Sequence, residues 1–278
     1  MDLFQKILEC KEEDVDSIIE TAINEANANA EKVEKLGFLD YGKSCSVFKG
    51  FIPLNTRIKY ANLNIEDYGM ESTDFIYEFV HFIKKYNINN KASLIHNLEY
   101  FVNSYFGFPG KIDRETIFND IAWQTTTTDE EYFKALENNK LGDLKGKGAA
   151  QCTERGALVQ QVLSIFGIES YYCMGCVDLG DRQEGHCFNI VKRKNDYALL
   201  DYSVPIVSYK EDGSVRAYYP FVGTLTNEEF LDFVNNGVIK SFDDYYMNGR
   251  QYEKAGTKRM YVVGKYEIEK ENAIENRR

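Results

Sequence analysis

The sequence has little positive charge. It holds 33 lysine and arginine residues against 44 aspartate and glutamate residues, a formal net charge of −11. Nucleic acids and anionic membranes bind positive patches, so this balance argues against both as general partners. No apolar run is long enough to cross a bilayer. Residues 1–16 lack the basic segment and apolar core of a signal peptide. We therefore expect a cytoplasmic protein.

Cysteine and histidine are also scarce. The six cysteines show no spacing typical of a disulfide framework in a chain of 278 residues, which fits a reducing compartment. The three histidines are His81, His96 and His186. His81 and His96 fall within helical patterns, where we interpret them as structural, whereas His186 opens an alternating segment.

The segment from Gly146 to Phe166 places a cysteine at the start of a predicted helix. Glycine and alanine lead up to Cys152, and Gly167 supplies a helix stop. The apolar stripe of this helix consists of Leu158, Val159, Val162, Leu163 and Phe166. The first turn of a helix carries partial positive charge and unpaired N–H groups, which favour a thiolate and can hold an oxyanion. A buried structural cysteine is the alternative interpretation.

A hairpin follows, with an alternating strand over 186–191 and a returning strand over 197–202. If Lys192–Asn195 forms a four-residue loop, then Val191 faces Asp196 and His186 lies opposite Asp201 on one face of the sheet. Nucleophile, base and orienting carboxylate would then be Cys152, His186 and Asp201. An ordinary polar pair at the end of a hairpin is the alternative.

These motifs resemble the transglutaminase-like superfamily within the papain-like fold. The matching pieces are GKGAAQC up to residue 152, FGIESYY at 166–172, GHCFN at 185–189 and LLDYSVP at 199–205. The resemblance spans residues 92–205. It implies a Cys-His-Asp triad at Cys152, His186 and Asp201. Phe188 stands where the family often has tryptophan, and Gln151 precedes the cysteine where aromatic or small residues are commoner.

The resemblance implies an α+β fold with a papain-like/transglutaminase-like core. In that core the helix that begins at Cys152 packs on an antiparallel sheet, and helices are added at the N-terminus. We expect an N-terminal region over 1–91 and a catalytic domain over 92–278, which together can form one compact unit. Four further residues are candidate substrate contacts: Gln151 beside the cysteine, Asp181 and Glu184 in a predicted loop over 178–185, and Trp123 as a cleft residue.

Apolar periodicity predicts the other elements. Long helices are expected over 12–36, 75–86 and 92–106, and shorter ones over 114–123, 227–235 and 242–247. Thr128 is expected to cap one more helix. Strands are expected within 44–65, where they form an accessory sheet, over 168–177 and over 259–268. A hairpin turning at 211–213 and a solvated tail after residue 268 complete the prediction.

Cys173 and Cys176 form a Cys-x-x-Cys pair, which is half of a common zinc site and also a redox motif. If residues 168–177 are extended, the two side chains face opposite sides of the strand. A redox pair normally opens a helix, which this pair does not. We therefore predict no metal and no cofactor.

The chemistry expected is acyl transfer through a thioester on Cys152, with hydrolysis of peptide or amide bonds preferred because nothing in the sequence marks a dedicated amine site. The substrate would be a peptide, a protein or a small amide. Transamidation or deamidation of glutamine, acetyl transfer of the arylamine type, and a non-catalytic binding module of the same fold stay open as alternatives.

Overall fold

The computed structural model describes fifteen segments of the chain. These are residues 3–30, 34–35, 46–54, 56–58, 68–106, 141–146, 150–178, 183–201, 206–209, 215–219, 221–236, 238–239, 245–247, 250–252 and 260–262. The predicted helices over 114–123 and after Thr128, Trp123, and the predicted tail lie outside these residues.

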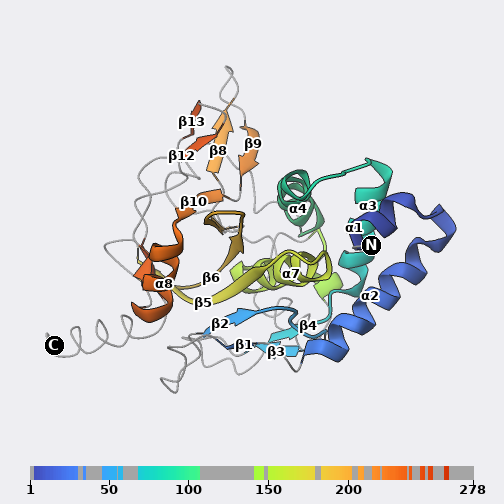
Figure 1. Cartoon of the computed structure of the whole chain (residues 1–278), viewed down its shortest axis with the longest axis horizontal. Coiled ribbons are helices and arrows are strands. Elements are labelled where there is room, and N and C mark those ends of the chain that lie inside the picture. Colours follow the sequence, from blue (N-terminus) through green and yellow to red (C-terminus); the bar gives the residue numbers. More distant parts are fainter. Residues whose placement is uncertain are drawn as a thin grey trace, which may run out of the picture.

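A single helix, α7 (Cys152–Ile165), runs through the middle of the molecule (Figure 1). It contacts strands β5 (Ser170–Asp178) and β6 (Gln183–Lys192) on one side and helix α2 (Val15–Asn29) on the other. All twelve residues from Cys152 to Leu163 are buried. The helix begins and ends where the sequence predicts, and Gly167 has a φ of +65° at its C-terminal turn. It is buried all round rather than along one apolar stripe.

The buried polar face of α7 ties it to the segment after β2 (Ser46–Lys49). The Gln160 side chain donates to the carbonyl of Gly50 at 2.8 Å and to that of Ser170 at 3.1 Å. The Gln161 side chain donates to the carbonyl of Ile52 at 2.9 Å. Buried amides are stable only when they are hydrogen-bonded, so these contacts specify how α7 is seated.

The main sheet is antiparallel, with the strand order β1-β2-β5-β6-β7-β10. Its other strands are β1 (Glu34–Lys35), β7 (Tyr197–Leu200) and β10 (Phe221–Leu225). One edge of β5 is shared: β2 pairs with residues 171–174, and β14 (Met260–Val262) pairs with residues 176–178. Strand β14 also pairs with β11 (Val238–Ile239). The protein is therefore an α+β protein, as predicted.

The sheet has a different covering on each face. Tyr172, Met174, Cys187 and Val191 join one large cluster with α7 and the N-terminal helices. The alternate residues form a second cluster that includes Phe230 and Phe233 of α8 (Asn227–Asn236). The other members of that cluster are Val47, Tyr171, Cys173, Phe188, Ile190, Tyr197, Leu199 and Leu225. The two-residue period of the strands thus separates two cores.

The N-terminal part of the large cluster is helical. It consists of α1 (Leu3–Glu9), the short helix η1 (Glu12–Asp14), α2, α3 (Thr73–Lys85) and α4 (Lys91–Phe106). The helices predicted over 75–86 and 92–106 are confirmed as α3 and α4. Aromatic rings of α3 and α4 pack against each other, with Phe75 at 5.0 Å from Tyr105 between ring centroids. The cluster includes residues on both sides of the expected boundary at residues 91–92, and the division into two regions stays a prediction.

The predicted helix over 12–36 is wrong at its C-terminal end. Helix α2 ends at Asn29, and residues 34–35 form a strand. The asparagines of this segment hydrogen-bond backbone groups: Asn27 accepts from the N–H of Leu54 at 3.2 Å, and Asn29 donates to the carbonyl of Glu25 at 2.8 Å. Such side chains compete with the helical hydrogen bonds and favour termination.

The strands predicted within residues 44–65 are confirmed in part, but their place in the sheets differs from the prediction. Strand β2 belongs to the main sheet instead of an accessory one. Strands β3 (Thr56–Ile58) and β4 (Tyr68–Met70) form a separate two-stranded sheet. The isolated turn η3 (Leu141–Leu144) lies between α4 and α7 in the chain.

The C-terminal third contains one further correction. Strands β8 (Ile206–Tyr209) and β9 (Val215–Tyr219) form the predicted hairpin. Helix α8 confirms the helix predicted over 227–235, and β14 confirms the predicted strand for residues 260–262. The predicted helix over 242–247 is wrong, because residues 245–247 form β12, which pairs with β13 (Arg250–Tyr252). Tyrosine favours strands, and the intervening sequence is Asn-Gly, which favours two-residue hairpins. Among the described residues, no helix is long and apolar enough to cross a membrane.

Gly156 allows α7 to lie close to β5. A Cβ atom at this position would stand 2.9 Å from Cε2 of the buried Tyr172 ring. We expect Gly156→Ala to be destabilising, because overpacking costs about 1–3 kcal/mol and helix propensity returns at most about 1 kcal/mol. Gly142→Ala is the matched control, since its new Cβ would meet only ordinary contacts at 3.5 Å or more. Urea unfolding measures both variants, and a Gly156→Ala protein as stable as the wild type contradicts this packing.

Candidate active site

Cys152 is the first residue of α7, and the structure holds it there with a cap. Gln151 is the N-cap residue with extended backbone angles (φ −95°, ψ −172°). Its N–H donates to Oε2 of Glu154 at 2.7 Å. Cys152 is 8% exposed and Glu154 is fully buried. The thiol therefore lies at the positive end of a buried helix, where the helix dipole acts in a medium of low polarity.

His186 and Asp201 are joined by a hydrogen bond. Nε2 of His186 lies 2.8 Å from Oδ2 of Asp201, and the two residues are 6% and 0% exposed. His186 is on β6, and Asp201 directly follows β7. The His186 ring stacks beside Phe188, two residues along the same face of the strand. The pairing expected from the sequence is thus present.

The register of the hairpin differs from the prediction by two residues. Strand β6 continues through Lys192, which pairs with Tyr197, so the four-residue loop is Arg193–Asp196 instead of Lys192–Asn195. The turn is closed by Arg193, whose N–H donates to the carbonyl of Asp196 at 2.8 Å and whose guanidinium binds the Asp196 carboxylate. Extending this register places Asp201 beside Phe188, diagonal to His186. A shift of two residues keeps side chains on the same face, so the His186–Asp201 contact survives.

The electrostatic surroundings of His186 connect it to Cys152. Burial alone would lower the pKa of His186, but the charge of Asp201 and its hydrogen bond, followed by a hydrogen bond with the Cys152 side chain, raise the pKa to about 10. An imidazole in this setting is protonated at neutral pH. The structure therefore brings together the three residues that the sequence singles out.

Asn189 fixes the distance between α7 and β6. Its side-chain N–H donates to the carbonyl of Gly156 at 3.0 Å and to the side-chain oxygen of Gln160 at 3.3 Å. The hydroxyl of Tyr172 on β5 donates to the carbonyl of Thr153 at 3.3 Å. Helix and sheet are thus hydrogen-bonded within the first three turns after Cys152.

A second thiol lies beside the site. Cys187 is buried, and its Sγ is 3.6 Å from the hydroxyl of Thr153. Burial and a hydrogen bond with Cys152 raise the pKa of Cys187 well above its usual range, which keeps this thiol protonated. Sequence reasoning did not find Cys187 or the buried charges Glu154 and Arg155. The only signal available was the polar run Thr-Glu-Arg directly after Cys152.

Of the four other candidate substrate contacts, the structure describes two, Gln151 and Glu184. Gln151 is exposed and adjoins Cys152. Glu184 is on β6, two residues before His186, while Asp181 and Trp123 lie outside the described residues. The predicted loop over 178–185 is wrong in extent, because β5 reaches residue 178 and β6 begins at residue 183. Gln183 pairs with Asp178 and so extends the sheet beyond His186.

Cys173 and Cys176 both lie on β5, so the segment that contains them is extended. Cys173 is fully buried in the cluster that contains α8, whereas Cys187 belongs to the cluster around α7. Within the described part of the chain, no group of three or more histidine, cysteine or acidic residues is arranged to hold a metal ion.

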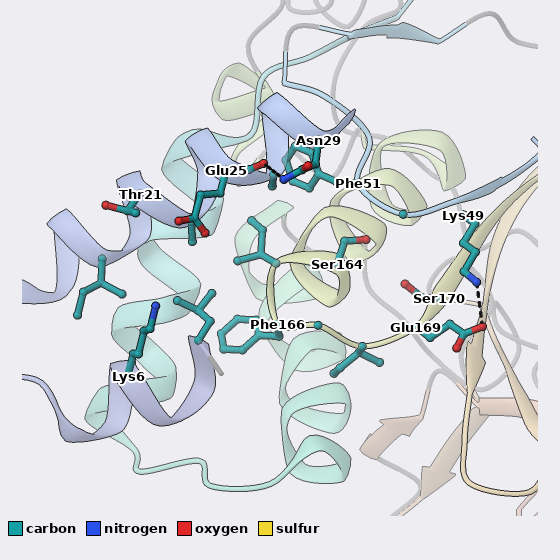
Figure 2. A pocket seen from close by; sticks show the side chains of 18 of the residues that line it. Lys6, Thr21, Glu25, Asn29, Lys49, Phe51, Ser164, Phe166, Glu169 and Ser170 are labelled. Atoms are coloured by element: carbon teal, nitrogen blue, oxygen red, sulfur yellow. Dashed lines mark hydrogen bonds and ion pairs between the residues drawn. The ribbon is translucent and has the colours of Figure 1, made fainter. Parts of the chain in front are cut away.

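A cavity of about 900 Å³ lies at the other end of α7 (Figure 2). It is bounded by α1, α2 and the turn Ser164–Gly167, and Lys49 forms an ion pair with Glu169 at 3.3 Å beside it. A helix of 14 residues is about 20 Å long. The cavity is therefore separate from the site at Cys152.

Comparisons with protein-family models and with curated proteins find no match for this chain. The function of the protein must therefore be inferred from the site itself.

The ion pair of His186 and Asp201 makes stability depend on pH. The pKa of His186 in the folded protein is raised above its unfolded value of 6.5. The ion pair therefore makes its full contribution to the free energy of unfolding below pH 6.5. This contribution is lost as the pH rises toward the pKa of the folded protein. One bound proton corresponds to a slope of at most about 1.4 kcal/mol per pH unit. We expect Asp201→Asn to remove this contribution.

Urea unfolding of the wild type and Asp201→Asn at several pH values between about 6 and 8.5 measures the effect. The difference in free energy of unfolding should be largest at the acidic end and shrink as the pH rises. Comparing the two proteins cancels the titration of the other cysteines and tyrosines. A difference that stays constant over this range would show that Asp201 does not control the His186 proton.

Proposed function

We propose that this protein is a cysteine-dependent acyl-transfer enzyme that hydrolyses peptide or amide bonds through a thioester on Cys152. One observation carries the proposal: a thiol at a helix N-terminus, an imidazole and a carboxylate meet in one buried cluster. Cys152 and Asp201 each hydrogen-bond the His186 side chain. This arrangement has the roles of nucleophile, base and orienting group that acyl transfer requires.

We also propose that the core is papain-like, of the transglutaminase-like type. Three features support this: a cysteine opens the central helix, this helix packs on an antiparallel sheet, and the histidine lies on β6 while the aspartate directly follows the neighbouring strand β7. Cys10, Cys152, Cys173 and Cys187 form no disulfide bond. A reducing compartment such as the cytoplasm fits both this finding and the chemistry.

The first half of the reaction forms the thioester. Because Nε2 of His186 is held by Asp201, Nδ1 is the ring nitrogen that we assign to the thiol. The proton of Cys152 resides on His186, and Sγ attacks the carbonyl carbon. The resulting oxyanion is stabilised by the N–H of Cys152 at the helix N-terminus. The tetrahedral intermediate collapses, His186 gives its proton to the leaving amine, and the acyl group stays on sulfur.

The second half releases the acid. His186, now neutral, accepts a proton from water while the water oxygen attacks the thioester carbonyl. Collapse expels the Cys152 thiolate and frees a carboxylic acid, which restores the thiolate and the protonated imidazole. Asp201 orients the ring and stabilises its cationic form in both halves. Water is the acceptor we propose, because an amine competes only if the protein binds and orients it.

The test compares Cys152 with Cys10, a more exposed cysteine on the N-terminal side of the chain. We expect iodoacetamide at neutral pH to label Cys152 faster than Cys10, although Cys152 is the more buried, because only a thiolate reacts. Cys152→Ser should reduce turnover of fluorogenic peptide amides by a factor of at least about 10³ and leave the melting temperature within a few degrees. Cys10→Ser is the matched control and should retain activity.

Mass spectrometry of the products in the presence of a primary amine identifies the acceptor, and we expect the free acid. Incorporation of the amine would replace hydrolysis by transamidation and leave the nucleophile unchanged. Equal labelling of all cysteines, or turnover that survives Cys152→Ser, would contradict the proposed function itself.

A further inference from the structure

Arg155 is a fully buried cation in the first turn of α7. It is 1% exposed and has one of the largest side chains enclosed in the protein. Its Nε donates to the carbonyl of Ala150 at 3.0 Å, and its Cζ lies 5.5 Å from the centroid of the Phe106 ring. The guanidinium therefore folds back along α7 toward the helix N-terminus, the direction in which helical side chains point.

This placement is unfavourable in two ways. Moving a charged group from water into a protein interior costs on the order of several kcal/mol, even after the surrounding protein has relaxed. A cation at a helix N-terminus also meets the positive end of the dipole, which prefers anions. The ring of Phe106 and the carbonyl of Ala150 offset part of this cost. A buried cation at this point is best offset by negative charge close by.

Two groups that can carry negative charge share the first turn with Arg155. Glu154 is fully buried, and Cys152 lies three residues earlier, where i and i+3 side chains are neighbours on a helix. Burial lowers the pKa of Arg155 to about 10, and the charges of Glu154 and Cys152 act in the opposite direction. Arg155 thus interacts with the sulfur of Cys152 when that sulfur is negatively charged.

We propose that Arg155 is a positioning residue, which anchors the backbone before Cys152 through Ala150 and stabilises the negative charge on the Cys152 sulfur. The inference depends on the proposed function only in that Cys152 is the nucleophile. Arg155 is buried and acts through Cys152, not on substrate. The groups that face this sulfur or share its electrostatic environment are Glu154, Arg155, Tyr172, His186, Cys187 and Asp201.

The test measures the rate of iodoacetamide alkylation of Cys152 against pH, by mass spectrometry of the peptide that contains it. Removing a neighbouring opposite charge shifts a titration by about 1–3 units. We expect Arg155→Met to move the pH midpoint of alkylation upward by that amount. Arg155→Lys keeps the positive charge, so its alkylation midpoint should lie close to that of the wild type. Arg193→Met is the matched control, because Arg193 is an exposed arginine paired with Asp196 in the β6–β7 turn.

Glu154→Gln provides a second variant in case Arg155→Met does not fold. Removing this negative charge should move the midpoint downward, while glutamine can still accept from the N–H of Gln151. A purely structural Arg155 would lower the melting temperature without moving either midpoint. Folded variants with unchanged midpoints would overturn the inference. A missing turnover together with shifted midpoints would instead overturn the reaction assigned to the site and leave the role of Arg155 standing.

Discussion

The close contact between α7 and strands β5 and β6 is the constraint on which the rest of the structure depends. Gly156 lets the helix approach the Tyr172 ring, and the Asn189 side chain donates to the carbonyl of that same glycine at 3.0 Å. The helix N-terminus is thereby held at a fixed height above β6. Without this seating, the thiol of Cys152 and the ring of His186 would belong to separate elements with no defined distance between them.

The site that results is an array of buried charges. Two carboxylates, an imidazolium and a guanidinium are enclosed around one sulfur, and each is too costly to bury alone. Asp201 offsets His186 directly at 2.8 Å, while Glu154 caps the helix and shares the first turn with Arg155. Such arrangements concentrate perturbed titrations, and in many enzymes they mark the reacting groups. In this chain the array lies about a helix length from the cavity beside α2.

Much of this arrangement could be predicted from the sequence because it depends on local patterns. The small residues before Cys152 and the stop at Gly167 define α7, and the alternation around His186 defines β6. The predicted register of the hairpin was wrong by two residues. His186 and Asp201 nevertheless lie on the same face, because a shift of two residues keeps every side chain on its side of the sheet. The actual loop is set by the Arg193–Asp196 contact, which no alternation pattern reveals.

Other features could not be predicted, because they arise from tertiary packing. Thr153, Glu154 and Arg155 read as an exposed polar face, and only the enclosure of α7 between sheet and helices buries them. Strand β2 joins the main sheet through pairing with a strand more than a hundred residues later. The end of α2 at Asn29 depends on side-chain hydrogen bonds that compete with the helix. Single-sequence periodicity contains none of this information.

The protonation state of the His186 ring tests the central claim most directly, because only the joint presence of Asp201 and Cys152 holds a buried imidazole charged. Nitrogen NMR shifts of this ring in the folded protein report which nitrogens carry protons as the pH is raised. The account predicts a doubly protonated ring at pH 7 and a pKa for His186 well above 6.5. A neutral ring at pH 7, with a titration midpoint at or below 6.5, would contradict it.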